Sequence, residues 1–131
     1  MGEKWSDDSI LAMIPNPTTE AYEINIRCEE ITFLGRSNQP DFATMNVTMY
    51  PGKNVIELKS LKLYLQQYRD KVISYERLVN VIYDDLIRVY RPARLRVEMD
   101  LRPRGGISSH LVIDSDWSAR GGQDKYRDWG R

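Results

Sequence analysis

Side chains that could do chemistry fall in four short segments of the sequence. The segments are Gln39-Pro40-Asp41-Phe42-Ala43, Glu57-Leu58-Lys59-Ser60-Leu61-Lys62-Leu63-Tyr64, Tyr75-Glu76 and Arg102-Pro103-Arg104-Gly105-Gly106-Ile107-Ser108. Each segment offers a carboxylate or a cation at a place where the local pattern changes. Each therefore has both a structural and a functional interpretation.

Asp41 and Glu76 are the two carboxylates with the clearest alternatives. Asp41 follows a proline in a loop, where it is either a turn former or a proton donor at the mouth of a site. Glu76 begins a predicted helix, where it is either an ordinary first-turn acid or an acceptor for two N–H donors of a guanine-like ring. Carboxylates suit that two-point geometry.

The other two segments bring cations together. Glu57 and Lys59 begin a predicted helix, so they form either a plain helix entry with a solvated lysine face or an anion site at the N–H groups of the first turn. Arg104-Gly105 either forms a bend between two strands or places a cation beside flexible backbone at a ligand.

The sequence contains one cysteine, Cys28, and one histidine, His110. Two such distant residues make no ligand set, so we expect no metal and no catalytic zinc. Cys28 falls on the apolar face of a predicted strand, which favours a small buried hydrophobe and a poor nucleophile. A single cysteine allows no internal disulfide and fits a reducing compartment.

Hydrophobic periodicity predicts the elements that must position these groups. Alternation predicts strands at 22–29, 45–50, 94–102 and 107–113, and steps of three and four predict helices at 58–72 and 78–90. This ββααββ order predicts an α+β fold with two helices on one face of an antiparallel sheet. Because four strands leave two exposed edges, we expect subunits to pair edge to edge into rings.

We expect an N-terminal arm at 1–20, one domain at 21–114 and a C-terminal tail at 115–131, with Trp117 and Trp129 pinning the tail to the body or to a neighbouring subunit. Lys and Arg together number 19, as do Asp and Glu. This balance argues against direct nucleic-acid binding. Since no apolar run approaches the ~18 residues of a membrane span and the first residues show no signal region, we expect a cytoplasmic protein with no membrane partner.

In their order and spacing, the four segments closely resemble the short, single-domain form of the QueF family. These proteins are NADPH-dependent 7-cyano-7-deazaguanine reductases of the queuosine pathway of tRNA modification. The resemblance runs from about Tyr22 to Ser108, and the segment 57–64 is its most specific part. It implies a tunnelling fold (T-fold), homo-oligomeric rings with sites at subunit interfaces, a 7-deazaguanine or purine-like ligand, and NADPH as cofactor.

The resemblance also implies roles for individual residues. Asp41 matches the proton donor; Ile56, Glu57, Leu58, Tyr75 and Glu76 match substrate-binding positions; Leu58, Lys59, Arg104 and Gly105 match cofactor contacts. Tyr75 stands where the family usually has histidine, and Leu58 where it often has serine.

One catalytic position departs from the family pattern. Members attack the nitrile with a cysteine thiolate a few residues before the Gln-Pro-Asp-Phe motif, and two hydride transfers from NADPH reduce the resulting thioimide. Here that loop is one residue shorter, and Gly35 or Leu34 stands in place of the cysteine. Ser37 has no histidine near it in sequence to activate its hydroxyl, which is otherwise a weak nucleophile.

Three functions follow from these observations. The first is the family's nitrile reductase. The second is a catalytically divergent or non-reducing homologue that binds a 7-deazaguanine or another purine-like ligand, which the missing thiol favours. The third is a structural, ring-forming subunit.

Overall fold

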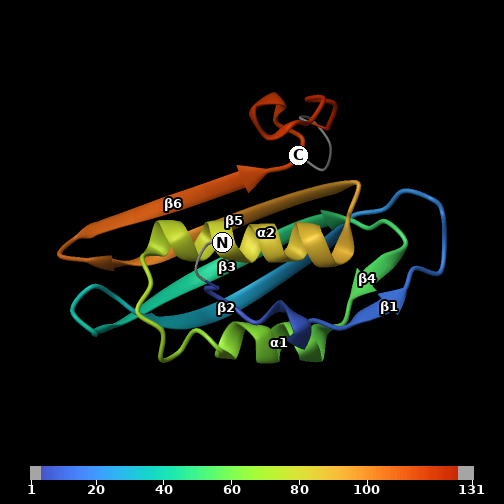
Figure 1. Cartoon of the computed structure of the whole chain (residues 1–131). Coiled ribbons are helices and arrows are strands. Elements are labelled where there is room, and N and C mark those ends of the chain that lie inside the picture. Colours follow the sequence, from blue (N-terminus) through green and yellow to red (C-terminus); the bar gives the residue numbers. More distant parts are fainter. Residues whose placement is uncertain (1–3, 127–131) are drawn as a thin grey trace.

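The computed structural model describes residues 4–126 of the chain (Figure 1). Its elements are η1 (Asp8–Ile10), β1 (Met13–Pro15), β2 (Ile24–Leu34), β3 (Pro40–Tyr50), β4 (Asn54–Ile56), α1 (Leu58–Gln66), α2 (Tyr75–Tyr90), β5 (Arg94–Arg104), β6 (Ile107–Asp114) and η2 (Ser118–Arg120). Strands β2, β3, β5 and β6 form one antiparallel sheet in that spatial order, and β1 pairs with β4. The predicted α+β class and the ββααββ order of the main elements are confirmed.

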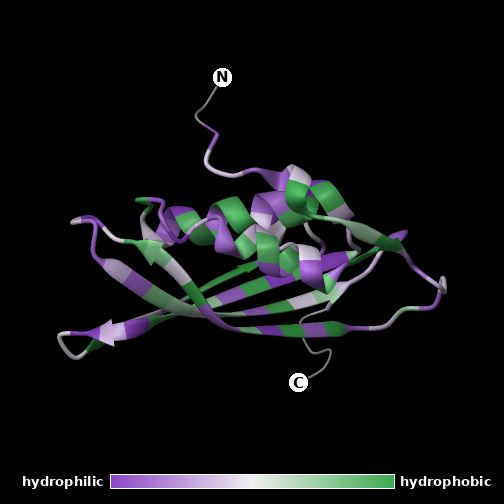
Figure 2. Cartoon of the chain, turned by 90° about the horizontal axis from the view of Figure 1, so that it is seen from below, coloured by the Kyte–Doolittle hydropathy of each residue, from purple (hydrophilic) through white to green (hydrophobic). Residues whose placement is uncertain are grey.

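The main sheet has one apolar face because side chains alternate between the two sides of each strand. Its register aligns Met45 with Met99 and Val47 with Val97, and all four side chains are buried. Both helices cover this face, α1 beside β2 and α2 beside β5 and β6 (Figures 1 and 2). The opposite face is polar and carries His110 among its side chains.

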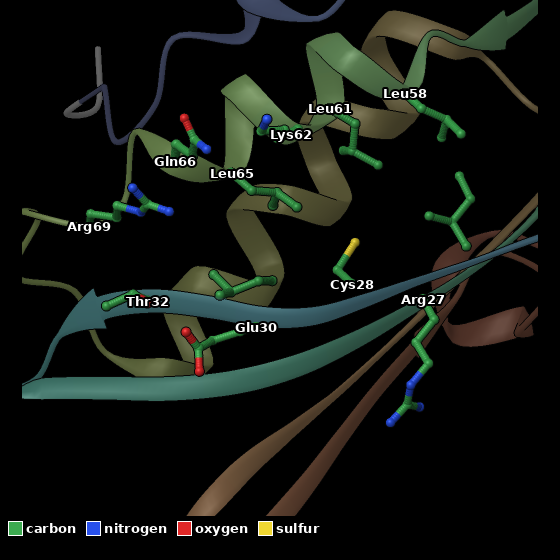
Figure 3. Close-up of a pocket in the computed structure, with 12 residues that line it drawn as sticks. Arg27, Cys28, Glu30, Thr32, Leu58, Leu61, Lys62, Leu65, Gln66 and Arg69 are labelled. Atoms are coloured by element: carbon green, nitrogen blue, oxygen red, sulfur yellow. The ribbon is translucent and has the colours of Figure 1, made fainter.

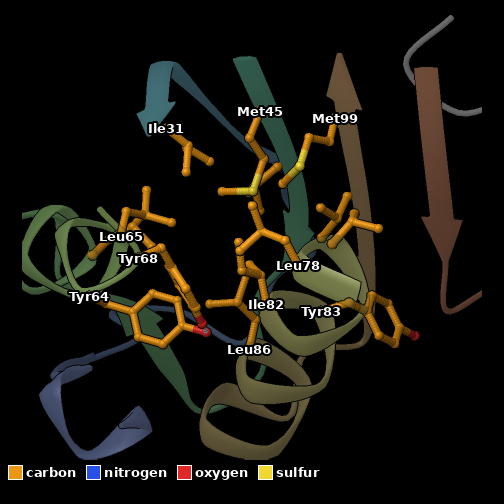
Figure 4. Close-up of a cluster of buried hydrophobic side chains, with 14 of the residues drawn as sticks. Ile31, Met45, Tyr64, Leu65, Tyr68, Leu78, Ile82, Tyr83, Leu86 and Met99 are labelled. Atoms are coloured by element: carbon orange, nitrogen blue, oxygen red, sulfur yellow. Dashed lines mark hydrogen bonds between the residues drawn. The ribbon is translucent and has the colours of Figure 1, made fainter. Parts of the chain in front are cut away.

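The helix layer closes the core against this face (Figure 4). Leu78, Ile82 and Leu86 of α2 are fully buried at helical spacing. From the α1 side, the rings of Tyr64 and Tyr68 meet edge to face, with centroids 5.6 Å apart, and their hydroxyls are hydrogen-bonded.

Several predicted boundaries were wrong. β2 continues to Leu34 because a bulge between Cys28 and Ile31 shifts the register without ending the strand pair, and β3 begins at Pro40. The first helix ends at Gln66 rather than at residue 72. Tyr68 belongs to a turn that returns it to the core, which extended the apparent helical spacing.

Parts of the predicted arm and tail pack on the body. Residues 13–15 form β1, and the Asp116 carboxylate folds the tail back by accepting the backbone N–H groups of Lys125 (3.1 Å) and Tyr126 (2.8 Å). Tyr126 lies against the body, with its ring edge-on to that of Tyr50. Trp117 is 39% exposed, and Trp129 lies outside the described residues. The domain boundaries stay predictions.

Candidate functional site

One end of the sheet brings the β2–β3 loop, the β5–β6 hairpin and the α1–α2 connection together (Figure 1). There Arg104 forms an ion pair with Asp41 and donates to the side-chain oxygen of Gln39 (2.7 Å) and the carbonyl of Pro40 (3.3 Å). Two residues from distant segments, the predicted proton donor Asp41 and the predicted cofactor contact Arg104, therefore meet within one chain. We call this region the hairpin end: Gly35, Gln39, Asp41, Arg104 and the adjacent Gly105.

Of the two candidates for the missing cysteine, Gly35 is the one that faces Asp41. Phe33 pairs with Asp41 across the strands, so positions 33 and 35 share the side of the sheet toward which Asp41 points, whereas Leu34 points to the other side. A Cβ on Gly35 would collide with the Oδ2 atom of Asp41. The carboxylate thus occupies the space that a side chain at position 35 would need.

The first turn of α2 also lies at this end. Ser74 caps the helix by accepting the backbone N–H of Arg77 (3.1 Å). The Tyr75 ring is buried, and its hydroxyl donates to the carbonyls of Met99 and Ser109 (3.0 Å to the latter). Tyr75 therefore ties α2 to the β5–β6 hairpin and leaves the neighbouring Glu76 side chain exposed.

The segment that begins α1 has a different environment. The Glu57 carboxylate accepts the backbone N–H groups of Ser60 (2.8 Å) and Lys59 (3.0 Å), so it occupies the anion position at this helix N-terminus itself. Ile56 is buried, while Leu58 and Lys59 are exposed. A ligand phosphate here would have to be held by lysine side chains rather than by those two backbone groups.

The predicted site residues thus form two groups in one chain. Ile56 and Leu58 lie beside Ile24 and Ile26, in the wall of a cavity of about 200 Å³ at the start of β2, whereas Gly35 follows the end of β2. An eleven-residue strand spans roughly 33 Å at about 3.3 Å per residue. The structure does not bring segment 56–59 to the hairpin end of the same chain.

A larger cavity of about 400 Å³ separates α1 from β2 (Figure 3). Cys28 lines it together with Leu58, Leu61 and Leu65, and its side chain is half-buried, where the sequence predicts a small buried hydrophobe. Burial raises the pKa of Cys28 to about 11, which keeps the thiol protonated near neutral pH. Cys28 pairs with Met45, about 13 Å along the strand from Asp41, and cannot replace the missing nucleophile within this chain.

Asp85 was missed in the sequence, where it follows Asp84 and resembles part of a solvated pair. Its carboxylate is buried and accepts hydrogen bonds from Ser6 Oγ and the Tyr64 hydroxyl, both 2.5 Å, beside an ion pair with Arg88. Helical spacing could have predicted that Asp85 is buried, because position 85 lies three residues after Ile82 on the apolar side of α2.

Two further findings concern the described residues alone. Within 4–126, no three His, Cys, Asp or Glu side chains are grouped so as to hold a metal ion. In the same range, no helix has the length and apolar character needed to cross a bilayer.

Comparison with known proteins points to one family. A family model described as QueF-like protein matches residues 40–120. An NADPH-dependent 7-cyano-7-deazaguanine reductase of Acaryochloris marina is 41% identical over 115 residues, 86% of this chain and 78% of the relative. A protein of the same name from Thermomicrobium roseum is 42% identical over 113 residues, 85% of this chain and 88% of the relative.

The fold is similar to that of a solved structure. The archaeosine synthase QueF-Like in its apo form superposes with a TM-score of 0.63, covering 74% of this chain and 94% of that one at 16% sequence identity. This likeness supports the predicted tunnelling-type fold, and at this identity it bears on the fold alone.

Proposed function

This chain belongs to the QueF family, and from that premise we propose that it binds a 7-deazaguanine base between two subunits without forming a thioimide. The observation that carries the proposal is that the Asp41 carboxylate lies where a Cβ at position 35 would be. The Asp41 carboxylate fills the space of a nucleophile at position 35, while this chain has residues at the positions matched to ligand binding.

Glu76 is the residue we propose to hold the base. Its side chain is exposed and has no side-chain partner within residues 4–126, while Ser74 and Tyr75 on the preceding positions are both anchored. A carboxylate on a fixed helix turn can accept two parallel N–H donors, which the amino and ring N–H groups of a guanine-like base provide. Charge-assisted hydrogen bonds of this kind contribute about 1.5–3 kcal/mol each.

A second subunit completes the proposed site. Segment 56–59 lies roughly 30 Å from Asp41 in its own chain, too far for one base to contact both. Within the described sheet, β6 pairs on one side only, and the outer side of β2 carries only the bridge between Leu34 and Val72. Most of both outer edges is therefore available to neighbouring copies. We propose that ring assembly through these edges brings segment 56–59 of one copy to the hairpin end of the next.

NADPH is the cofactor that the family implies, and exposed cations of this chain fit its phosphates. Lys59 projects from the first turn of α1. The Arg104 side chain is 51% exposed, and its guanidinium has the planar fork that suits phosphate oxygens. When bound, NADPH supplies hydride. Because Arg104 pairs with Asp41, a phosphate that engages Arg104 would compete with that ion pair.

Base binding is tested by calorimetry with 7-cyano-7-deazaguanine. We expect the wild-type protein to bind and Glu76→Ala to weaken binding by about tenfold or more, since one charged hydrogen bond is worth at least about 1.5 kcal/mol. Asp84→Ala, which removes another exposed carboxylate of the same helix, serves as the control and should bind normally. Equal affinity in the wild type and Glu76→Ala would refute the assignment.

The absence of a thioimide is tested by intact mass after incubation with 7-cyano-7-deazaguanine, with and without NADPH. We expect no mass increase and no difference between the wild type and Cys28→Ala. An adduct that disappears in Cys28→Ala would show that Cys28 reaches a substrate, against its burial and raised pKa.

Reduction of the nitrile is the second candidate, favoured by the names of relatives at about 40% identity over most of the chain. It requires NADPH consumption that depends on the nitrile. Consumption that persists in Cys28→Ala and is lost in Asp41→Asn would support a route without a thiol, with Asp41 as its proton donor.

A further inference from the structure

The N-terminal arm connects the two separated segments that match substrate-binding positions. At one end, the guanidinium of Arg77, the residue after Glu76, lies 4.6 Å from the centroid of the Trp5 ring. At the other end, the carbonyl of Ala12 accepts the backbone N–H of Glu57 (3.2 Å), and Met13 pairs with Ile56. The arm thus runs along the helix layer to β1 (Figure 1).

Between these ends the arm is fastened to both helices and to their connection. Ser6 is buried and donates to Asp85. The backbone N–H of Asp7 donates to the Gln67 side chain (2.7 Å), and Lys71 donates to the carbonyl of Trp5 (2.9 Å). The position of Trp5 is therefore fixed relative to α2.

We infer that this arm is a positioning element for Glu76, which rests on the proposed role of Glu76 in binding the base. Trp5 restrains the first turn of α2 from the outside through Arg77, and the Tyr75 hydroxyl restrains it from the inside through two strand carbonyls. Glu76 lies between these two restraints. A carboxylate that must meet two donors at once is sensitive to small rotations of the turn that carries it.

The test compares Trp5→Ala with Trp5→Phe, which keeps an aromatic face for Arg77, and with Trp117→Ala, which removes a tryptophan outside the arm. Since a cation–π contact at an accessible site is worth about 0.5–1 kcal/mol, we expect about two- to fivefold weaker binding of 7-cyano-7-deazaguanine in Trp5→Ala. Trp5→Phe should restore most of the affinity, and Trp117→Ala should leave it unchanged.

A second measurement needs no ligand. Hydrogen exchange of the first-turn amides of α2 should accelerate in Trp5→Ala and not in Trp5→Phe, while exchange in the last turns of α2 stays at the wild-type rate. A uniform acceleration along the helix would show general destabilisation and overturn the inference.

Wild-type affinity together with wild-type exchange in Trp5→Ala would also overturn it. If the wild-type protein itself binds no base, the proposed function fails and exchange alone decides. Faster first-turn exchange would then still support positioning of the turn by the arm, and unchanged exchange would refute it.

Discussion

The hairpin end and the helix layer both contain clusters of polar side chains, but these clusters differ in what they are attached to. In the helix layer, Glu57 caps α1, Ser60 receives the N–H of Ala12 (2.9 Å), and Tyr64 donates to the buried Asp85. At the hairpin end, Arg104 at the end of β5 pairs with Asp41 near the start of β3 and is half exposed. The first cluster holds helices, arm and core together, whereas the second joins two strand ends beside their loops.

This difference determines what a substitution changes in each region. In segment 57–64, the residues Glu57, Ser60, Leu61 and Tyr64 face the fold, whereas Leu58, Lys59, Lys62 and Leu63 are exposed. A change among the first four costs stability. A change at Gly35 alters a loop and its neighbour Asp41, so residues there can vary while the fold persists.

The largest effect we expect is on stability, from Asp85→Ala. The substitution removes the buried carboxylate that accepts from the Ser6 and Tyr64 hydroxyls, of which Tyr64 keeps its hydrogen bond with Tyr68. It also removes one of the two carboxylates paired with Arg88, which keeps Asp8. Leaving buried polar groups unpaired costs about 1–3 kcal/mol each, so urea unfolding should show a loss of about 3 kcal/mol. Asp84→Ala, on the exposed neighbour, should change stability by less than about 0.5 kcal/mol. Similar losses in both variants would mean that the buried hydrogen bonds of Asp85 do not hold the helix layer together.

The next effect separates the two clusters directly. Glu57→Ala removes the cap of α1 and should lower the unfolding free energy by about 1 kcal/mol. Arg104→Ala breaks a half-exposed ion pair between two strand ends and should lower it by less than about 0.5 kcal/mol. The same urea titration measures both. A larger loss for Arg104→Ala would mean that the hairpin end supports the fold after all.

The sequence was sufficient for the fold because the information there is periodic. Alternation in β3 and β5 and helical spacing in α2 follow directly from burial on one side. It was insufficient where long-range partners decide the outcome. Nothing local predicts that Ser6 and Tyr64, 79 and 21 residues away in sequence, converge on Asp85. The meeting of Asp41 with Arg104 depends on strand register, which single-sequence patterns do not give.

A smaller effect should be a pH-dependent contribution of His110, in β6, to stability. His110 is hydrogen-bonded to Asp100 (2.6 Å) and lies near Glu98, and these carboxylates raise its pKa. A raised folded-state pKa gives stability that is full below about pH 6.5, the unfolded value, and is lost as pH rises through the folded value. Because the ring is 45% exposed, solvent screening limits the contribution to less than about 1 kcal/mol. The unfolding free energy of His110→Gln, measured from pH 5 to 8, should not show this fall with rising pH. A fall equal to that of the wild type would mean that groups other than His110 cause it.

The smallest effect we expect is on reductase activity in Gly35→Cys, which should gain none. The new Cβ would meet the Asp41 carboxylate, which Arg104 holds in place, so the thiol and the proton donor would compete for one space. A thiolate beside a carboxylate is also disfavoured by like charge. Nitrile-dependent NADPH oxidation should therefore stay at the wild-type level, with no adduct by intact mass. Leu34→Cys is the matched control, because it places a thiol on the other side of the sheet without the collision. If Gly35→Cys alone forms an adduct and consumes NADPH, the carboxylate moves aside freely, and the loss of the cysteine is the only barrier between this site and nitrile reduction.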